Sequence, residues 1–104
     1  MNETEKQINI AKFLDHLGKI IQIPSKNRAK KPVLQYAASK IEADAQYSEK
    51  GINEILKLWC VVDHIEMRRA LIDMGYLCRT ADGAKYWLAD EIPQSWVWKE
   101  KEYA

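Results

Sequence analysis

The stretch 67–88 limits what this chain can fold into more than any other part of its sequence. Apolar residues recur at helical spacing until Gly75, and glycine readily ends a helix in the left-handed conformation. Two short runs of apolar and aromatic residues, 76–79 and 84–88, then flank Asp82-Gly83. Because Asp-Gly favours the positive φ angles of a tight hairpin, the pattern predicts a helix, a strand, a two-residue turn and a second strand.

The residues before this stretch predict two more helices with an extended residue between them. One helix begins near Pro32, since proline suits a first helical turn, and the next begins after Ser48, which is a good N-cap. Tyr47 precedes Ser48 as a one-residue strand, and Asp63 caps the helix that leads to Gly75. The order helix, bridge, helix, helix, strand, strand is that of a winged helix, a helix-turn-helix followed by a β-hairpin.

The first residues predict an extension to this core. Thr4 and Gln7 fit a capping box at the start of an amphipathic helix that ends near Gly18. The run 20–23 is β-prone, and Pro24 stops it. We therefore expect an α+β fold that is mostly helical, namely a winged helix with an N-terminal helical extension.

The length of 104 residues predicts a single domain, 1–104. Its expected parts are an N-terminal helix and short strand (1–24), a winged-helix core (25–90) and an aromatic C-terminal tail (91–104). No apolar run reaches the roughly 18 residues that a bilayer span needs, and the acidic N-terminus is unlike a secretory signal. We expect a cytoplasmic protein with no membrane contact.

Basic residues form two groups, although the formal net charge is only +1. The first group lies in a window without acidic residues between Asp15 and Glu42, and the second lies on the last helix and the hairpin. That helix and the hairpin loop are the usual DNA contacts of a winged helix, where arginine and lysine bind phosphates. The candidate nucleic-acid contacts are Lys26, Arg28, Lys30, Lys31, Arg68, Arg69, Arg79 and Lys85.

The adjacent arginines also have a structural interpretation. One of Arg68 and Arg69 would pair with a nearby carboxylate such as Glu66 or Asp73, and the other would be solvated. Carboxylates on the same helix would repel phosphate, which argues against DNA binding by these arginines. The basic connector before the second helix would likewise be a solvated loop.

The sequence predicts no metal site, no cofactor and no catalytic centre. Cys60 and His64, spaced i, i+4, would share a helix face and could form half of a zinc site that Cys78 and His16 would have to complete. Free, buried cysteines are the simpler interpretation, because no CxxC pair is present. No phosphate-binding glycine loop or nucleophile motif occurs, so we expect no enzyme, and no small-molecule ligand is indicated.

The C-terminal tail carries two tryptophans at alternate positions. Trp96 and Trp98 would lie on one side of an extended segment. Exposed aromatic residues anchor interfaces, so this side would cover either the domain's own surface or a second copy. We expect one of these contacts rather than a ligand site.

Six short motifs, taken together, are similar to those of a known family. They are Ile23-Pro24-Ser25-Lys26, Tyr47-Ser48-Glu49-Lys50, Ile52-Asn53-Glu54-Ile55-Leu56, Arg68-Arg69-Ala70-Leu71, Gly75-Tyr76-Leu77 and Asp82-Gly83-Ala84-Lys85-Tyr86-Trp87. The chain resembles, over about residues 13–88, a small bacterial family catalogued as a domain of unknown function. Members occur alone or fused behind helix-turn-helix regulators of the arsenical-resistance-repressor type. The resemblance implies a winged-helix-like domain linked to transcription and no catalytic residue. The chain departs from the family pattern at Pro32 and in the apolar run 59–62.

Two functions follow as hypotheses. The first is a DNA-binding module, a bacterial or phage transcriptional regulator or an accessory domain of one, acting as a homodimer. The second is a non-enzymatic module that uses the winged-helix scaffold for protein interaction or dimerisation. The near-neutral charge, the acidic residues on the last helix and the tryptophan tail favour the second.

Overall fold

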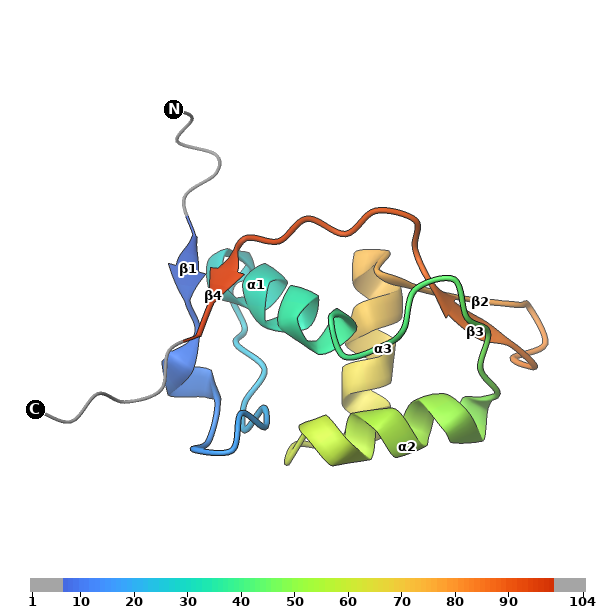
Figure 1. The fold of residues 1–104 in the computed structure, drawn as a ribbon, viewed down its shortest axis with the longest axis horizontal. Coiled ribbons are helices and arrows are strands. Elements are labelled where there is room, and N and C mark those ends of the chain that lie inside the picture. The colour runs from blue at the N-terminus through green and yellow to red at the C-terminus, as the bar shows by residue number, and fades with distance from the viewer. Residues whose placement is uncertain (1–6, 99–104) are drawn as a thin grey trace, which may run out of the picture.

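The computed structural model describes residues 7–98 of the chain. An α+β fold that is mostly helical is confirmed. Its elements are β1 (Ile8–Asn9), the 3-10 helix η2 (Ala11–Phe13), α1 (Asn27–Ala38), α2 (Glu49–Trp59), α3 (His64–Met74), β2 (Leu77–Arg79), β3 (Tyr86–Leu88) and β4 (Trp96–Val97). Figure 1 shows α3 running across α1 and α2, with β1 and β4 at one end of the molecule and the β2–β3 hairpin at the other.

The boundaries of α2 and α3 agree with the capping residues in the sequence. The Ser48 side chain accepts a hydrogen bond from the Gly51 N–H at 3.0 Å, and the Asp63 carboxylate accepts one from the Ile65 N–H at 2.9 Å. Each bond satisfies a donor that a helix N-terminus leaves free. Gly75 ends α3 with a φ of 86°, the left-handed conformation that glycine adopts without a steric penalty.

The hairpin is present, but its loop is longer than the predicted two-residue turn. β2 pairs antiparallel with β3 from Leu77–Leu88 to Arg79–Tyr86, so residues 80–85 form the loop. Within it, the Asp82 carboxylate accepts hydrogen bonds from the Thr80 hydroxyl and the Ala84 N–H. These bonds lower the pKa of Asp82 and organise the loop. Only Gly83 of the expected pair has a positive φ, so the turn is not the tight type that Asp-Gly favours.

A third chain segment joins the hairpin edge. Tyr47 forms an antiparallel bridge with Tyr86, with both backbone N–H···O distances at 2.8 Å. The predicted one-residue strand before α2 is therefore confirmed. It connects the α1–α2 loop to β3 and fixes the hairpin against the helices.

The core lies between the three helices and the hairpin. Its fully buried side chains are apolar or aromatic and lie between Ile10 and Tyr86 in the sequence. They include Ile10, Ile20, Val33, Leu34, Tyr36, Ile52, Leu56, Met67, Leu71, Leu77 and Tyr86. The packing of α3 against both other helices through Met67 and Leu71 leaves its opposite side in solvent.

The predicted N-terminal helix is wrong. Residues 8–9 form β1, and the 3-10 helix that follows ends at Phe13. Gly18 adopts a φ of 84° in a turn, not at a helix end. The predicted strand at 20–23 is reduced to single bridges from Ile20 to Leu14 and to Cys60. The proposed capping residue Thr4 lies outside the described residues.

The predicted start of α1 at Pro32 is also wrong. The helix begins at Asn27, and Pro32 lies inside it as a buried residue. Proline has no N–H, so the carbonyl of Arg28 loses its usual helical partner. The basic residues expected in a connector therefore belong largely to the first turns of α1.

The C-terminal segment returns to the N-terminal segment. β4 pairs parallel with β1, so Trp96 lies beside Ile8 and Val97 beside Asn9. The pair closes the end of the molecule where α1 begins, as Figure 1 shows. No helix in the described part of the chain is long and apolar enough to cross a bilayer.

Candidate functional site

Arg68, a leading candidate for DNA contact, is held within the fold. Its Nη1 donates a hydrogen bond to Asn53 Oδ1 at 2.7 Å and lies 3.4 Å from Glu49 Oε2. The guanidinium carbon stands 5.8 Å from the centre of the Tyr86 ring, and only 14% of the side chain is exposed. Arg68 therefore ties α3 to α2 and the hairpin. Its partners come from α2 and not from Glu66 or Asp73, the carboxylates expected from sequence.

The solvent-facing side of α3 carries one apolar, one basic and two acidic side chains. Ile65, Glu66, Arg69 and Asp73 are its exposed side chains. Their formal charges sum to −1, so this side offers one cation against two carboxylates. Arg69 is the solvated arginine of the adjacent pair, as the structural interpretation of the sequence proposed.

The basic groups do not form one stripe. Lys26, Arg28 and Lys31 are exposed and Lys30 is half-buried, all at the start of α1. Arg79 and Lys85 are exposed at the hairpin. Figure 1 places the start of α1 beside β1 and β4, whereas the hairpin loop lies at the opposite end of the long axis. Arg68, which would connect the two groups, is largely buried and paired.

An apolar surface surrounds the connection between α2 and α3. Leu58 is 65% exposed, Val61 63% and Ile65 41%, and all lie on one short stretch of chain. Ile21, 42% exposed, is next to them, because the Val61 N–H donates to the Ile20 carbonyl at 2.8 Å. We call these four residues the corner surface. Sequence reasoning missed it, because the β-prone run 20–23 and the helical spacing before Gly75 do not show which of their apolar side chains remain exposed.

The tryptophan tail covers the domain's own surface. The rings of Trp96 and Trp98 meet the Tyr36 ring edge-on, with centroids 5.0 and 6.3 Å apart. The Tyr36 hydroxyl donates to the Gly18 carbonyl at 2.6 Å. The ammonium of Lys40 stands 4.5 Å from the centre of the same ring. Tyr36 therefore holds both Gly18, from the N-terminal segment, and the two tryptophans, from the C-terminal segment, against α1.

The cysteines and histidines do not assemble into a metal site within residues 7–98. No group of three or more His, Cys, Asp or Glu side chains there could hold an ion. Cys60 is buried and Cys78 is half-buried, both as free thiols. Burial raises the pKa of the Cys60 thiol to about 12, so it remains protonated and is a poor metal ligand at neutral pH.

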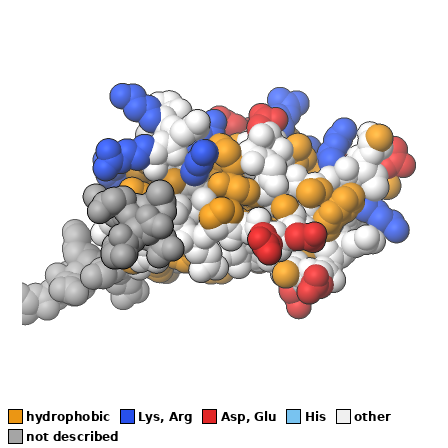
Figure 2. Space-filling model, turned by 90° about the horizontal axis from the view of Figure 1, so that it is seen from above, with side chains coloured by type: hydrophobic (Ala, Val, Ile, Leu, Met, Phe, Trp, Pro, Cys, Tyr) orange, Lys and Arg blue, Asp and Glu red, His pale blue; other side chains and the backbone are white. Residues whose placement is uncertain are grey.

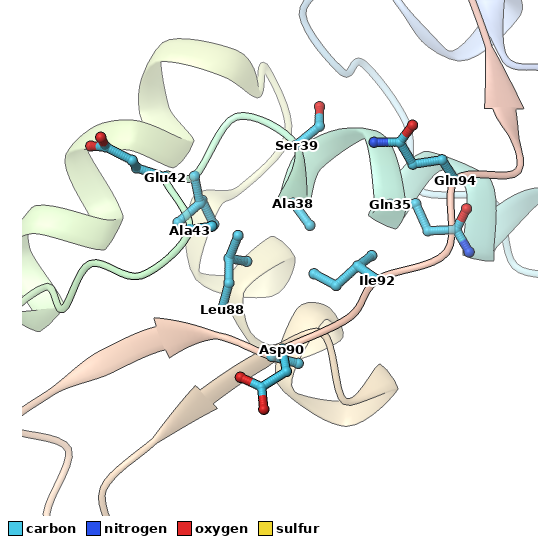
Figure 3. Close-up of a pocket in the computed structure, with 11 residues that line it drawn as sticks. Gln35, Ala38, Ser39, Glu42, Ala43, Leu88, Asp90, Ile92 and Gln94 are labelled. Carbon is cyan, nitrogen blue, oxygen red and sulfur yellow. The ribbon is translucent and has the colours of Figure 1, made fainter.

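A cleft lies between the end of α1, the end of β3 and the segment 89–95. It encloses about 420 Å³. Figure 3 shows Ala38, Leu88 and Ile92 converging on it, with the carboxylates of Glu42 and Asp90 at its periphery. Figure 2 looks onto this side of the molecule, where hydrophobic side chains gather beside acidic ones. Its lining comes from separate chain segments, so no motif in the sequence signals it.

Comparison with known proteins identifies the family but no function. Residues 19–88, well over half of the chain, match the model of a family described as "Uncharacterized protein conserved in bacteria (DUF2087)". No curated protein matches the chain, and no solved structure does. The matched region runs from the turn before Ile20 to the end of the hairpin, and so contains the α-helices α1, α2 and α3. The chain therefore belongs to this uncharacterised bacterial family.

Proposed function

We propose that this chain is a non-enzymatic interaction module on a winged-helix scaffold and that it self-associates through the corner surface. The winged-helix assignment rests on the element order α1, Tyr47 bridge, α2, α3, β2, β3, in which Tyr47 pairs with Tyr86 at the edge of the hairpin. Two free cysteines favour a reducing compartment such as the cytoplasm.

The exposure of the corner surface is the observation that carries this proposal. Leu58 and Val61 each leave more than 60% of their surface in water. Burying such a side chain fully contributes roughly 1.5–3 kcal/mol. Single exposed apolar residues are ordinary, but four that adjoin one helix connection are typical of a contact surface.

The charges on α3 suit a second copy of the chain. Glu66 and Arg69 lie one helical turn apart on the exposed side of α3 and carry opposite charges. If two copies meet with antiparallel α3 helices about a two-fold axis midway between Glu66 and Arg69, each Glu66 faces the partner's Arg69, and Asp73 lies outside the pair. Such pairs contribute little affinity at a solvated rim, but they select the register of the contact.

Sedimentation velocity over a range of protein concentrations tests self-association. The wild-type protein should shift from monomer to dimer as concentration rises, whereas Val61→Glu and Leu58→Glu should remain monomeric, because each would bury a carboxylate against apolar side chains. Ala81→Glu is the control, since Ala81 is exposed in the hairpin loop, and Figure 1 places that loop far from the connection between α2 and α3. A wild-type protein that stays monomeric at millimolar concentration would contradict the proposal.

DNA binding is the second candidate, and it takes the smaller contact set Arg69, Arg79 and Lys85. These side chains are exposed on the helix and hairpin with which a winged helix contacts DNA, and a role in transcriptional regulation would depend on them. Lys26, Arg28, Lys30 and Lys31 belong to the start of α1, and Figure 1 places this end of α1 on the opposite side of the molecule from the hairpin, so they are left out of this set.

Titration of a random-sequence duplex at low and moderate salt tests this candidate. A binder weakens steeply with salt, because each phosphate contact releases counterions. Arg69→Ala should weaken binding and reduce the salt dependence, while Lys57→Ala, a charge removal on exposed α2, should not. Absence of binding at about 50 mM salt would reject DNA as the partner and leave self-association untouched.

A further inference from the structure

We infer that the cleft between α1, β3 and segment 89–95 binds a small amphipathic organic cation, in which a protonated amine is attached to an apolar body. Its volume of about 420 Å³ falls within the roughly 300–1,000 Å³ of typical small-molecule sites. The inference is independent of the proposed self-association, because no residue of α2 or α3 lines the cleft.

The floor of the cleft is apolar, whereas Gln35, Ser39 and Gln94 add polar side chains to its lining. Ile41 is buried, and Leu88 and Ile92 are half-buried, with part of each side chain facing the opening in Figure 3. Ala38 and Ala43 supply only methyl groups from the α1 side, which leaves room above the floor. An apolar ligand body would displace water from these side chains and so gain affinity.

The ionisable side chains at the opening are both acidic. Glu42 and Asp90 are exposed at its edge, and no Lys, Arg or His is among the residues that line it. Figure 3 shows both carboxylates directed outward from the rim, where their combined field at the opening attracts a cation and repels an anion. This charge pattern selects a cationic ligand over a neutral or anionic one of the same shape.

The cleft is held open by two anchors of the segment that crosses it. At one end, the Ala89 N–H donates to the Tyr76 carbonyl at 3.0 Å. At the other, the Ser95 N–H and hydroxyl both donate to Gln35 Oε1, at 2.8 and 2.7 Å, and Gln35 Nε2 donates to the Tyr76 hydroxyl at 3.0 Å. The residues between the anchors, 90–94, form no helix or strand, so they span the gap without filling it.

A bound cation would also contact the end of the hairpin. Leu88 is the last residue of β3 and lines the cleft directly. Ala89 follows it and carries the hydrogen bond to Tyr76. Binding in the cleft would therefore change the amide chemical shifts of these two residues and leave those of the corner surface unchanged.

A titration of the full chain followed by amide chemical shifts tests the inference. Phenethylamine, which is protonated at neutral pH, serves as the probe, with phenethyl alcohol and phenylacetate as its neutral and anionic counterparts. The amine should shift the amides of Leu88, Ala89 and Ile92, and it should bind at least about fivefold more tightly than the alcohol. Phenylacetate should bind more weakly than either.

Four variants make the test specific to the cleft. Glu42→Gln and Asp90→Asn should each weaken amine binding by about fivefold, and Ala43→Phe should block the opening. Glu91→Gln is the matched control, because Glu91 is an exposed carboxylate on the same segment that does not line the cleft. Equal binding of amine and alcohol, or shifts confined to other regions, would overturn the inference.

Discussion

Arg68 on α3 donates its shortest hydrogen bond to Asn53 on α2, at 2.7 Å, across the junction of the two helices. The same guanidinium approaches the Tyr86 ring of β3, so one side chain contacts three elements. Its contact with Glu49 is longer, at 3.4 Å, and that carboxylate is 54% exposed. The hydrogen bond to Asn53 therefore contributes more than the ion pair, which water screens.

Replacement of Arg68 by methionine should destabilise the protein. Methionine keeps an apolar stem against Tyr86 but removes the guanidinium, which leaves Asn53 without its donor. A hydrogen bond from a charged group contributes roughly 1.5–3 kcal/mol, and we expect a loss of that order in the free energy of unfolding by urea. A double-mutant cycle with Asn53→Ala should show coupling between the two residues.

Arg69→Met is the control for this prediction. Arg69 is adjacent in sequence and has the same intrinsic helix propensity, but its side chain is exposed. We expect its loss to change the stability by no more than about 0.5 kcal/mol. If both arginine variants lose the same free energy of unfolding, Arg68 does not hold the helices together as described.

Two glycines in the left-handed conformation should differ in their tolerance of alanine. At Gly18 (φ 84°) an added Cβ would lie 3.0 Å from the Tyr36 hydroxyl and 3.1 Å from the Trp98 ring. At Gly75 (φ 86°) nothing lies within 4 Å of that position. Backbone strain alone costs roughly 1–2 kcal/mol, so Gly75→Ala should lose about that much and Gly18→Ala clearly more. Equal melting temperatures for the two variants would show that the aromatic cluster does not press on Gly18.

Two buried tyrosine hydroxyls should respond in opposite ways to removal. The Tyr36 hydroxyl donates to the Gly18 carbonyl at 2.6 Å, whereas the Tyr86 hydroxyl is buried without a partner among the described residues. Tyr36→Phe should cost about 1–2 kcal/mol, because it leaves a buried carbonyl unsatisfied. Tyr86→Phe should be neutral or stabilising, since it removes an unpaired polar atom. The free energy of unfolding by urea is measured for both variants. A larger loss for Tyr86→Phe than for Tyr36→Phe would show that the Tyr86 hydroxyl has a hydrogen-bond partner.

The parts of the fold that sequence predicted well depend on neighbours in the chain. Ser48, Asp63 and Gly75 end or start their helices through bonds to residues at most four positions away. Helical spacing likewise places Met67 and Leu71 on the buried side of α3. Such interactions join residues that are close in sequence, so spacing and capping rules predict them.

The parts that sequence missed depend on distant segments. Ile10 and Leu14 have helical spacing, but β4 supplies hydrogen bonds to the backbone of β1, which makes strand pairing available instead. The partner of Arg68 is likewise Asn53, on another helix, and not a carboxylate of α3. The corner surface and the cleft arise in the same way, because exposure depends on which segments pack together and not on local spacing.

The thiol of Cys60 should be far less reactive than that of Cys78. The burial of the Cys60 thiol should also make the free energy of unfolding depend on pH. Burial raises the pKa of the Cys60 thiol from 9.0 to about 12, whereas Cys78 is half-buried in β2. Iodoacetamide should therefore alkylate Cys78 first in the folded protein, and both at similar rates in urea. Because the folded state retains the Cys60 proton where the unfolded state loses it, this residue's contribution to stability is intact below about pH 9 and is lost as pH rises toward 12. Alkylation of Cys60 at the same rate as Cys78 in the native protein would contradict the buried position of the thiol.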